Sequence, residues 1–191
     1  MRFPEFTFSK ICPMPDLQFA LEKLRRAQDG LLRAADSVPS GDWNIPPEVN
    51  AWSAAQLVAH LCQVERGVLG YADRVIRKMP RPVPLLNRFH LPLVIVELRL
   101  IRRKTPIPLD PELFAASKEA MLAELRSVRE RTLAFLEETY DRNLRAYYWP
   151  HPFLGKLNFY NWFTFIAAHE IRHTKQMVEI TKNLPKRVVT S

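Results

Sequence analysis

The residues best suited to chemistry are two histidines, His169 and His173, one helical turn apart near the end of the sequence. They lie in the apolar segment 159–180, where steps of three and four residues trace a seam of the kind that faces another helix in a bundle. Imidazoles in such a seam are cut off from water, so they need strong partners. A metal ion is one such partner, and side chains four residues apart in a helix point the same way.

The same segment contains HEIRH, which has the HExxH form of a zinc-protease helix with Glu170 as general base. The metzincin extension would need glycine and histidine where Gln176 and Glu179 stand. The sequence after His173 is also too short for the downstream glutamate ligand of other zinc proteases. No strand pattern offers an edge for a peptide substrate, so the protease interpretation is disfavoured.

The other source of a third ligand is upstream, in the helical segment 54–79. His60 interrupts the apolar stripe of this segment, as His169 and His173 interrupt theirs. Three neutral imidazoles with one open position form a catalytic site for zinc or a similar ion. A single buried histidine is more often a core residue than a ligand, but three on matching seams favour a metal site.

Three further residues are candidates for supporting roles around such a site. Gln176, one turn after the second histidine, could orient an imidazole or a bound water, or act only as a packing amide. Glu170 could serve as a catalytic base, or pair with Arg172 or another helix, because it lies about 100° round the helix from its histidine neighbour. His151 could overhang the site as a catalytic acid or base, or be a structural loop histidine.

Four long helical patterns must position these residues. Ser53 begins the second with a capping box completed by Gln56, Asn158 caps the fourth, and Asp16 is the expected N-cap of the first. There is no strand pattern and no internal repeat, so the expected fold class is all-α, a four-helix bundle. The expected helices cover about residues 16–38, 53–79, 110–140 and 158–183.

The remaining segments flank or interrupt the bundle. A proline-rich insertion from Pro80 to Pro111 separates the second and third helices. It is expected to contain a short helix at about residues 91–103, with an amphipathic membrane contact as the alternative. The expected divisions are an N-terminal arm at residues 1–15, a single domain at 16–184 and a C-terminal tail at 185–191.

The composition is that of one ordinary globular domain: 191 residues, 47% of them hydrophobic. No apolar run could span a bilayer and the first residues do not resemble a secretion signal, so a cytoplasmic protein is expected. The net charge of +8 is spread over several helices without interleaved aromatic residues, which favours solvated helix faces over nucleic-acid binding. Cys12 and Cys62 suggest no disulfide, and Cys62 is expected to be a buried apolar residue.

Three motifs carry a resemblance to a known family. They are Trp52-Ser53 leading to His60, the HP-x-x-G loop from His151 to Gly155, and the pattern H-x-x-x-H-x-x-Q that ends at Gln176. Over about residues 50–180 the sequence resembles the DinB-like family of four-helix-bundle metalloproteins. The insertion and the N-terminal arm depart most from the family pattern.

The resemblance implies a divalent metal ion, commonly zinc or nickel, bound by His60, His169 and His173 in a cavity at one end of the bundle, and a homodimer. It also implies a small-molecule substrate and one of two activities, a metal-dependent hydrolase or a thiol S-transferase that uses a low-molecular-weight thiol. The alternative is a non-catalytic metal-binding or stress-related interaction protein of the same fold. Nucleic-acid binding through the basic surface is a weaker third interpretation.

Overall fold

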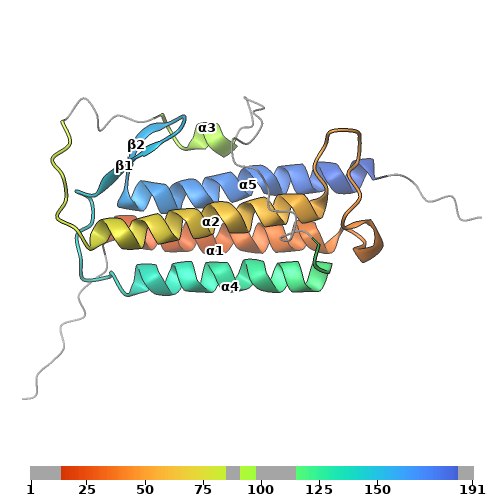
Figure 1. Ribbon diagram of the computed structural model, residues 1–191, viewed down its shortest axis with the longest axis horizontal. Helices are drawn as coiled ribbons and strands as arrows, with labels where there is room; N and C mark the ends of the chain where they lie inside the picture. Colours follow the sequence, from red (N-terminus) through yellow and green to blue (C-terminus); the bar gives the residue numbers. More distant parts are fainter. Residues whose placement is uncertain (1–13, 85–90, 98–114, 185–191) are drawn as a thin grey trace, which may run out of the picture.

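Four long helices run alongside one another as a bundle (Figure 1). The computed structural model describes residues 14–84, 91–97 and 115–184. The long helices are α1 (Pro15–Asp36), α2 (Ala54–Ile76), α4 (Lys118–Glu137) and α5 (Phe159–Asn183). The predicted four-helix bundle is thereby confirmed.

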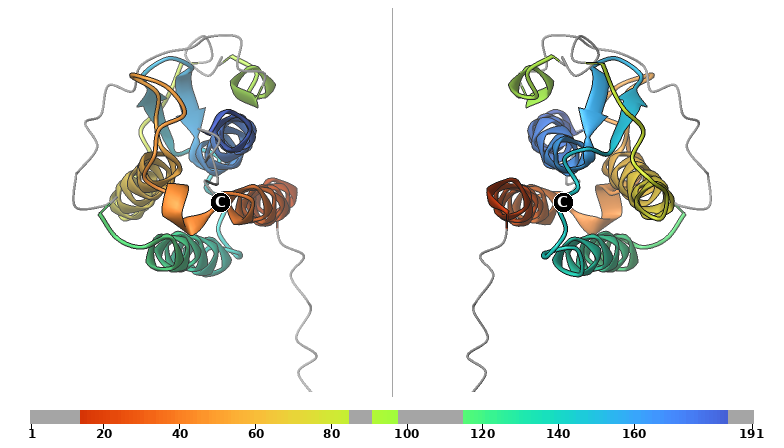
Figure 2. Two further views of the ribbon diagram at one scale, coloured as in Figure 1. Left: turned by 90° about the vertical axis from the view of Figure 1, so that its right-hand side faces the viewer. Right: turned by 90° about the vertical axis from the view of Figure 1, so that its left-hand side faces the viewer.

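The end-on views show how the four helices are arranged around the core (Figure 2). Helix α5 packs most extensively on α1, and α4 packs chiefly on α2. Helices α2 and α5 share a smaller interface, and α4 and α5 lie at opposite corners of the bundle. The two helices that carry the three histidines are therefore not held together by a large apolar contact of their own.

Side-chain caps set the start of two helices as predicted. The Ser53 hydroxyl accepts a hydrogen bond from the backbone N–H of Gln56 at 3.2 Å, and the Gln56 side-chain oxygen accepts one from the N–H of Ser53 at 3.0 Å. This reciprocal pair satisfies two N–H groups that the helix itself leaves open. At the start of α5 the Asn158 side-chain oxygen accepts from the N–H of Asn161 at 2.8 Å.

The starts of the other two helices differ from the prediction. Helix α1 begins at Pro15 with Met14 as its N-cap, so the assignment of Asp16 as N-cap is wrong. Proline suits the first helical position because its φ is fixed and its missing N–H is not needed there. Helix α4 begins at Lys118, where the Ser117 hydroxyl accepts the N–H of Ala120 at 3.2 Å. Its expected earlier start, at residue 110, lies outside the described residues.

A β-hairpin precedes α5, so the expectation that the chain has no strand is wrong. Strand β1 (Tyr148–His151) pairs antiparallel with β2 (Gly155–Asn158), with His151 opposite Gly155. Gly155 has a φ of 89°, which side chains rarely adopt, and this lets the chain turn back within a few residues. Each strand has four residues, too few for an alternating pattern to stand out in the sequence.

The insertion is described only in part. A one-turn helix, α3 (Val94–Glu97), packs on α5 and lies within the predicted short helix at 91–103. The backbone N–H of Leu91 donates to the carbonyl of Leu154 in the hairpin turn at 3.2 Å. Residues 85–90 and 98–114 lie outside the described part, so the predicted extent of the insertion stays a prediction. Residues 1–13 and 185–191, which hold most of the expected arm and tail, lie outside it as well.

The apolar core falls into two clusters arranged along the bundle. Along α5 the buried members of the first end at Ala167 and those of the second begin at Met177. Along α4 the second cluster ends at Val128 and the buried part of the first begins at Leu136. In these intervals lie buried polar side chains, among them Arg129, Glu170 and His173.

Two other expectations concern burial and membranes. Cys62 is 4% exposed and carries a free thiol, which confirms it as a buried small residue, whereas Cys12 lies outside the described part. Within residues 14–84, 91–97 and 115–184 no helix is long and apolar enough to cross a membrane.

Candidate metal centre

Three histidine side chains from two helices meet inside the bundle. His60 comes from the second turn of α2, and His169 and His173 come from successive turns of α5. The Nε2 atom of His169 lies 3.3 Å from Nε2 of His60 and 3.1 Å from Nε2 of His173. A set of potential ligand atoms, one from each residue, lies within 4.8 Å of one another. The structure thus brings together the three residues that the sequence singled out as ligands.

The spacing and the tautomer fit a metal ion. Two nitrogens bound at about 2.0–2.1 Å to a tetrahedral ion lie roughly 3.3 Å apart, close to the observed separations. The Nδ1 atom of His173 lies 3.0 Å from the side-chain oxygen of Gln176. An oxygen acceptor there requires a proton on Nδ1, which leaves the Nε2 lone pair of a neutral ring free to bind a metal. Gln176 therefore contacts a ring of the site, and its predicted orienting role stays a prediction.

Burial keeps these rings in the form that binds metals. His60 is 5% exposed and His173 is 7% exposed. Burial lowers the pKa of His60 to about 4. The pKa of His169 falls well below its usual value, chiefly through burial and then through the neighbouring His173 and His60. A neutral imidazole is the state a metal ion requires, because a protonated ring has no lone pair to offer.

Aromatic side chains wall the histidine site on two sides. The Trp52 ring lies 5.0 Å from that of His60, centroid to centroid, and stacks on that of His173 at 6.1 Å with an interplanar angle of 11°. Phe165 stacks on His169 at 5.4 Å. Neither aromatic was predicted as a site residue. Trp52 was placed only in a family motif, and the position of Phe165 one turn before His169 was the one available signal.

His151 lies in the hairpin, near the site but not in the ligand set. Its ring packs on Phe165 at 4.4 Å, and its Nδ1 accepts hydrogen bonds from the backbone N–H groups of Phe153 and Leu154 at 3.1 and 3.2 Å. Burial lowers its pKa to about 4. Its proton is therefore on Nε2 and the ring is neutral near pH 7. The predicted acid or base role stays a prediction, and these contacts favour a neutral N–H donor.

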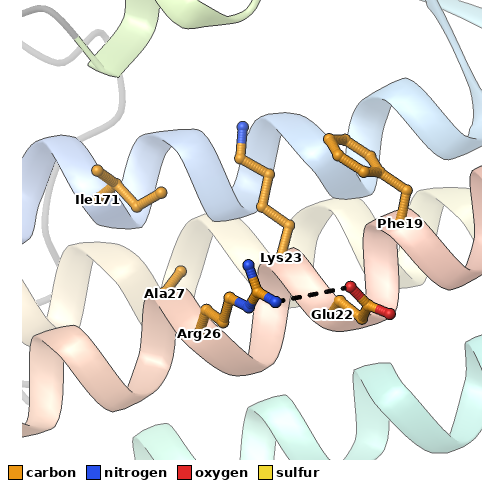
Figure 3. A pocket seen from close by; sticks show the side chains of 6 residues that line it. All are labelled: Phe19, Glu22, Lys23, Arg26, Ala27 and Ile171. Atoms are coloured by element: carbon orange, nitrogen blue, oxygen red, sulfur yellow. Dashed lines mark ion pairs between the residues drawn. The ribbon is translucent and has the colours of Figure 1, made fainter.

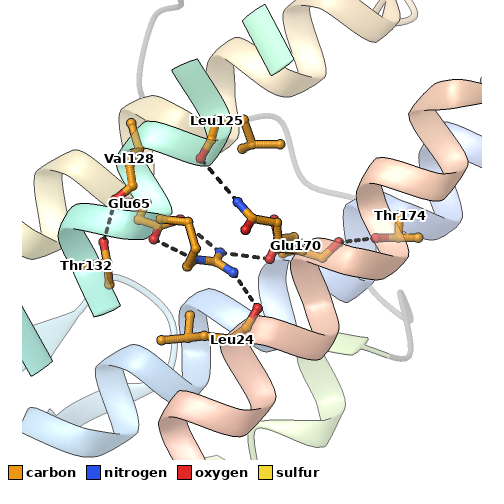
Figure 4. Close-up of polar contacts among 9 residues, drawn as sticks. Leu24, Glu65, Leu125, Val128, Thr132, Glu170 and Thr174 are labelled. Atoms are coloured by element: carbon orange, nitrogen blue, oxygen red, sulfur yellow. Dashed lines mark hydrogen bonds and ion pairs between the residues drawn. The ribbon is translucent and has the colours of Figure 1, made fainter. Parts of the chain in front are cut away.

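Glu170 points into a different part of the core. Its Oε2 accepts from Nη2 of Arg129 in α4 at 2.8 Å, and its Oε1 is buried without a partner among the described residues (Figure 4). Burial raises the pKa of Glu170 to about 7, although Arg129 opposes this. Of the two alternatives in the sequence analysis, pairing with another helix is what the contacts show. A general-base role stays a prediction.

A surface groove lies elsewhere, along α1 and α5 (Figure 3). Its volume is about 310 Å³, and none of the three histidines lines it. Two basic side chains line it: Lys23 is paired with Glu97 of α3 at 2.6 Å, and Arg26 lies 3.9 Å from Glu22. No convergent set of catalytic groups lines it, so we place the chemistry at the histidines. The lining residues are Phe19, Glu22, Lys23, Arg26, Ala27 and Ile171.

Comparison with known proteins agrees with this architecture. The uncharacterized protein YuaE of Bacillus subtilis is 29% identical over 147 residues, which cover 75% of this chain and 85% of YuaE. The structure of YfiT from Bacillus subtilis, described as a probable metal-dependent hydrolase with an unusual four-helix bundle topology, aligns with a TM-score of 0.61 at 15% identity. That alignment covers 95% of this chain and 92% of YfiT and shows a shared fold. The sequence profile of the DinB superfamily matches residues 23–177, and the chain therefore belongs to the DinB superfamily.

Proposed function

We propose that this protein is a metal-dependent hydrolase of a small molecule, with His60, His169 and His173 as the ligands of a divalent ion. The convergence of the three Nε2 atoms at 3.1 and 3.3 Å carries the proposal. All-imidazole donors suit borderline ions, so zinc or nickel is the proposed metal. The description of YfiT as a probable metal-dependent hydrolase supports the reaction class.

The chain supplies three ligands and leaves a further position open for chemistry. An ion held there would act as a Lewis acid and make a water molecule a nucleophile near neutral pH. Gln176 holds the proton of His173 on Nδ1, which keeps the Nε2 lone pair directed to the site. Trp52 and Phe165 limit access of bulk water, which strengthens electrostatic interactions at the site.

His151 is the proposed substrate-orienting group. With its Nδ1 occupied by two backbone N–H groups, the ring can offer only its Nε2–H. A neutral, fixed N–H donor can bind an oxygen on which negative charge develops in the transition state. Its low pKa makes it a poor proton shuttle near pH 7.

The first test is metal content. Protein purified without an affinity tag and supplied with zinc, nickel or manganese should bind about one ion per chain. Removal of the ion with a chelator should lower the melting temperature, because a ligand that binds only the folded state stabilises it. Protein that binds none of the three metals would overturn the proposal.

The second test is turnover. The metal-loaded protein should hydrolyse members of a panel of small esters and amides, and activity should disappear on chelation and return when the ion is restored. Low-molecular-weight thiols belong in the same screen. Product formation that requires the thiol, joins its sulfur to the substrate's acyl group as a thioester and releases the alcohol or amine, with no hydrolysis of any substrate, would replace hydrolysis by thiol S-transfer.

The expected homodimer can be checked on the same material. Its only support is the sequence resemblance, and it stays a prediction. Light scattering coupled to gel filtration should give twice the chain mass if it holds.

A further inference from the structure

A second buried polar cluster lies in the core of the bundle (Figure 4). At its centre is Arg129 of α4, which is 1% exposed. Its Nε and Nη2 donate to the two carboxylate oxygens of Glu65 in α2 at 2.8 and 3.0 Å. Nη2 also donates to Glu170 in α5 at 2.8 Å, and Nη1 donates to the carbonyl of Leu24 in α1. One side chain thus contacts all three of the other long helices.

Stability alone does not explain such a cluster. Removing charges from water costs several kcal/mol per ion, and well-packed apolar residues in place of a buried ion pair are often as stable or more stable. A buried guanidinium does offer fixed geometry, because its planar fork binds a carboxylate through two parallel hydrogen bonds. The contacts of Arg129 with Glu65 have this two-pronged form.

The carboxylates that Arg129 binds lie next to the metal-ligand candidates in the sequence. Glu170 directly follows His169 in α5, and Glu65 lies about one and a half turns after His60 in α2. The Glu170 side chain has Arg129 as its partner, and its second oxygen has none among the described residues. The guanidinium therefore binds α2 and α5 at positions close in sequence to His60 and His169.

The packing of the bundle explains why a polar link between α2 and α5 is needed. Helices α2 and α5 share only a modest interface, whereas each packs more extensively on another helix, α4 and α1 respectively. Arg129 of α4 donates a hydrogen bond to Glu170 of α5. These two helices lie at opposite corners of the bundle (Figure 2). A metal site tolerates displacements of only about 0.5 Å in its ligands. The separation of α2 and α5, which carry the three histidines, must therefore be fixed to within about 0.5 Å.

We propose that Arg129 is a positioning residue for the metal centre, which holds His60 against His169 and His173 by binding Glu65 and Glu170 together. The proposal rests on the proposed function, because it concerns the same three ligands. Arg129 itself is not a ligand, and its guanidinium donates to Glu65, Glu170 and the carbonyl of Leu24.

The decisive variant removes the whole cluster without leaving a buried charge: Arg129→Met, Glu65→Leu and Glu170→Gln together. We expect the metal-free variant to keep its helical circular dichroism and a cooperative melt, while its metal affinity, measured by competition with a chelator, falls at least tenfold. Outer-shell changes at metal sites have effects of about 10- to 100-fold. The cobalt form should also show weaker and shifted ligand-field bands.

The matched control is Arg131→Met, which removes an exposed arginine of the same helix, half a turn away, whose partner is Glu124. It should change neither the metal affinity nor the cobalt spectrum. If the triple variant fails to fold, Arg129→Lys is the second variant, because a single ammonium group cannot form the two parallel hydrogen bonds of the guanidinium. It should weaken metal binding while the bundle stays intact.

The outcomes separate this proposal from the proposed function. A folded triple variant with the wild-type metal affinity and cobalt spectrum would overturn the positioning role and leave the metal centre standing. Wild-type protein that binds no metal would overturn both. In the metal-free state, nuclear Overhauser contacts between the rings of His60 and His169 should be present in the wild type and lost in the triple variant. Contacts that persist in the variant would also overturn the positioning role.

Discussion

The two polar clusters of the core differ in how their groups are satisfied. In the Arg129 cluster every donor meets an acceptor from the same chain, because the guanidinium faces two carboxylates and a carbonyl. In the histidine cluster three Nε2 atoms face one another, and the Gln176 contact indicates that at least the Nε2 of His173 presents a lone pair. Guanidinium donors matched to acceptors serve as scaffold, although Oε1 of Glu170 has no partner among the described residues, whereas convergent lone pairs need a cation. The comparison predicts that the two clusters respond to mutation in different ways.

The largest expected difference is in metal binding. His60→Ala and His173→Ala should each reduce metal affinity by more than about 100-fold, since losing a ligand costs more than losing an outer-shell contact. Both variants should remain folded in the metal-free state, because the substitution also removes the buried polar group that needed the metal. Metal content after dialysis, with circular dichroism, measures both effects.

His151→Ala is the control and should keep its metal ion. An unchanged metal stoichiometry in His60→Ala would show that α2 does not provide a ligand.

The Arg129 cluster should respond through stability first. Arg129→Ala leaves Glu65 and Glu170 buried without their cation, and breaking a buried pair in this way costs about 3–5 kcal/mol. Urea unfolding of the metal-free protein measures the loss. Arg131→Ala removes an exposed ion pair and should leave stability nearly unchanged. An Arg129→Ala protein as stable as the wild type would mean that Glu65 and Glu170 do not depend on Arg129 as their buried cation.

Lowering the pH should change the stability of the metal-free protein in opposite directions through the two clusters. The pKa of His60 is lowered from 6.5 to about 4, so the unfolded state binds more protons in that window and stability is lost as pH falls from 6.5. The pKa of Glu170 is raised from 4.5 to about 7, so its contribution is present below pH 4.5 and is lost as pH rises towards 7. Each group contributes up to about 1.4 kcal/mol per pH unit.

Urea unfolding between pH 4.5 and 7.5 in the presence of a chelator tests both signs. His60→Leu should make the protein relatively more stable at the acid end, and Glu170→Gln relatively less stable there. The same direction of change in both variants would contradict the assignment of opposite protonation states to the two clusters.

The histidine cluster could be predicted from the sequence because its members are polar residues on otherwise apolar helix faces. The sequence pattern shows such an interruption directly, and the spacing of His169 and His173 fixes their common direction. The capping boundaries at Ser53 and Asn158 could be predicted for a similar reason, since they depend on residues within one turn of each other. Local patterns also sufficed for the bundle, because each helix carries its own apolar seam.

The Arg129 cluster could not be predicted in the same way. Glu65, Arg129 and Glu170 are charged residues in helices with many charges, and the sequence alone gives no sign that these three face inward. Their partners are also on different helices, so no local spacing connects them. Trp52 and Phe165 were missed for a related reason, since aromatics in a capping segment or an apolar seam are expected as packing residues. Contacts made across the bundle are decided by packing, which the sequence pattern does not show.

Cys62 gives the smallest and most local test, because it lies in α2 between His60 and Glu65. Burial raises the pKa of its thiol to about 12, and the nearby Glu65 and Glu170 add to this. Its alkylation near pH 8 therefore requires a local opening of the core. In a Cys12→Ser background, Arg129→Lys should raise the rate of alkylation by iodoacetamide about tenfold, which corresponds to a loss of about 1.4 kcal/mol in the free energy of that opening.

The control for this measurement is Arg131→Lys in the same background, which should leave the rate unchanged, and Cys62→Ser confirms that the signal comes from this thiol. Adding the metal ion to wild-type protein should slow the reaction further, because the bound ion would join α2 to α5 at His60. If Arg129→Lys and wild type react at the same rate while the ion still protects, the metal site alone holds this part of α2. In that case the two clusters are independent, and the Arg129 cluster belongs to the scaffold of the bundle and not to its metal centre.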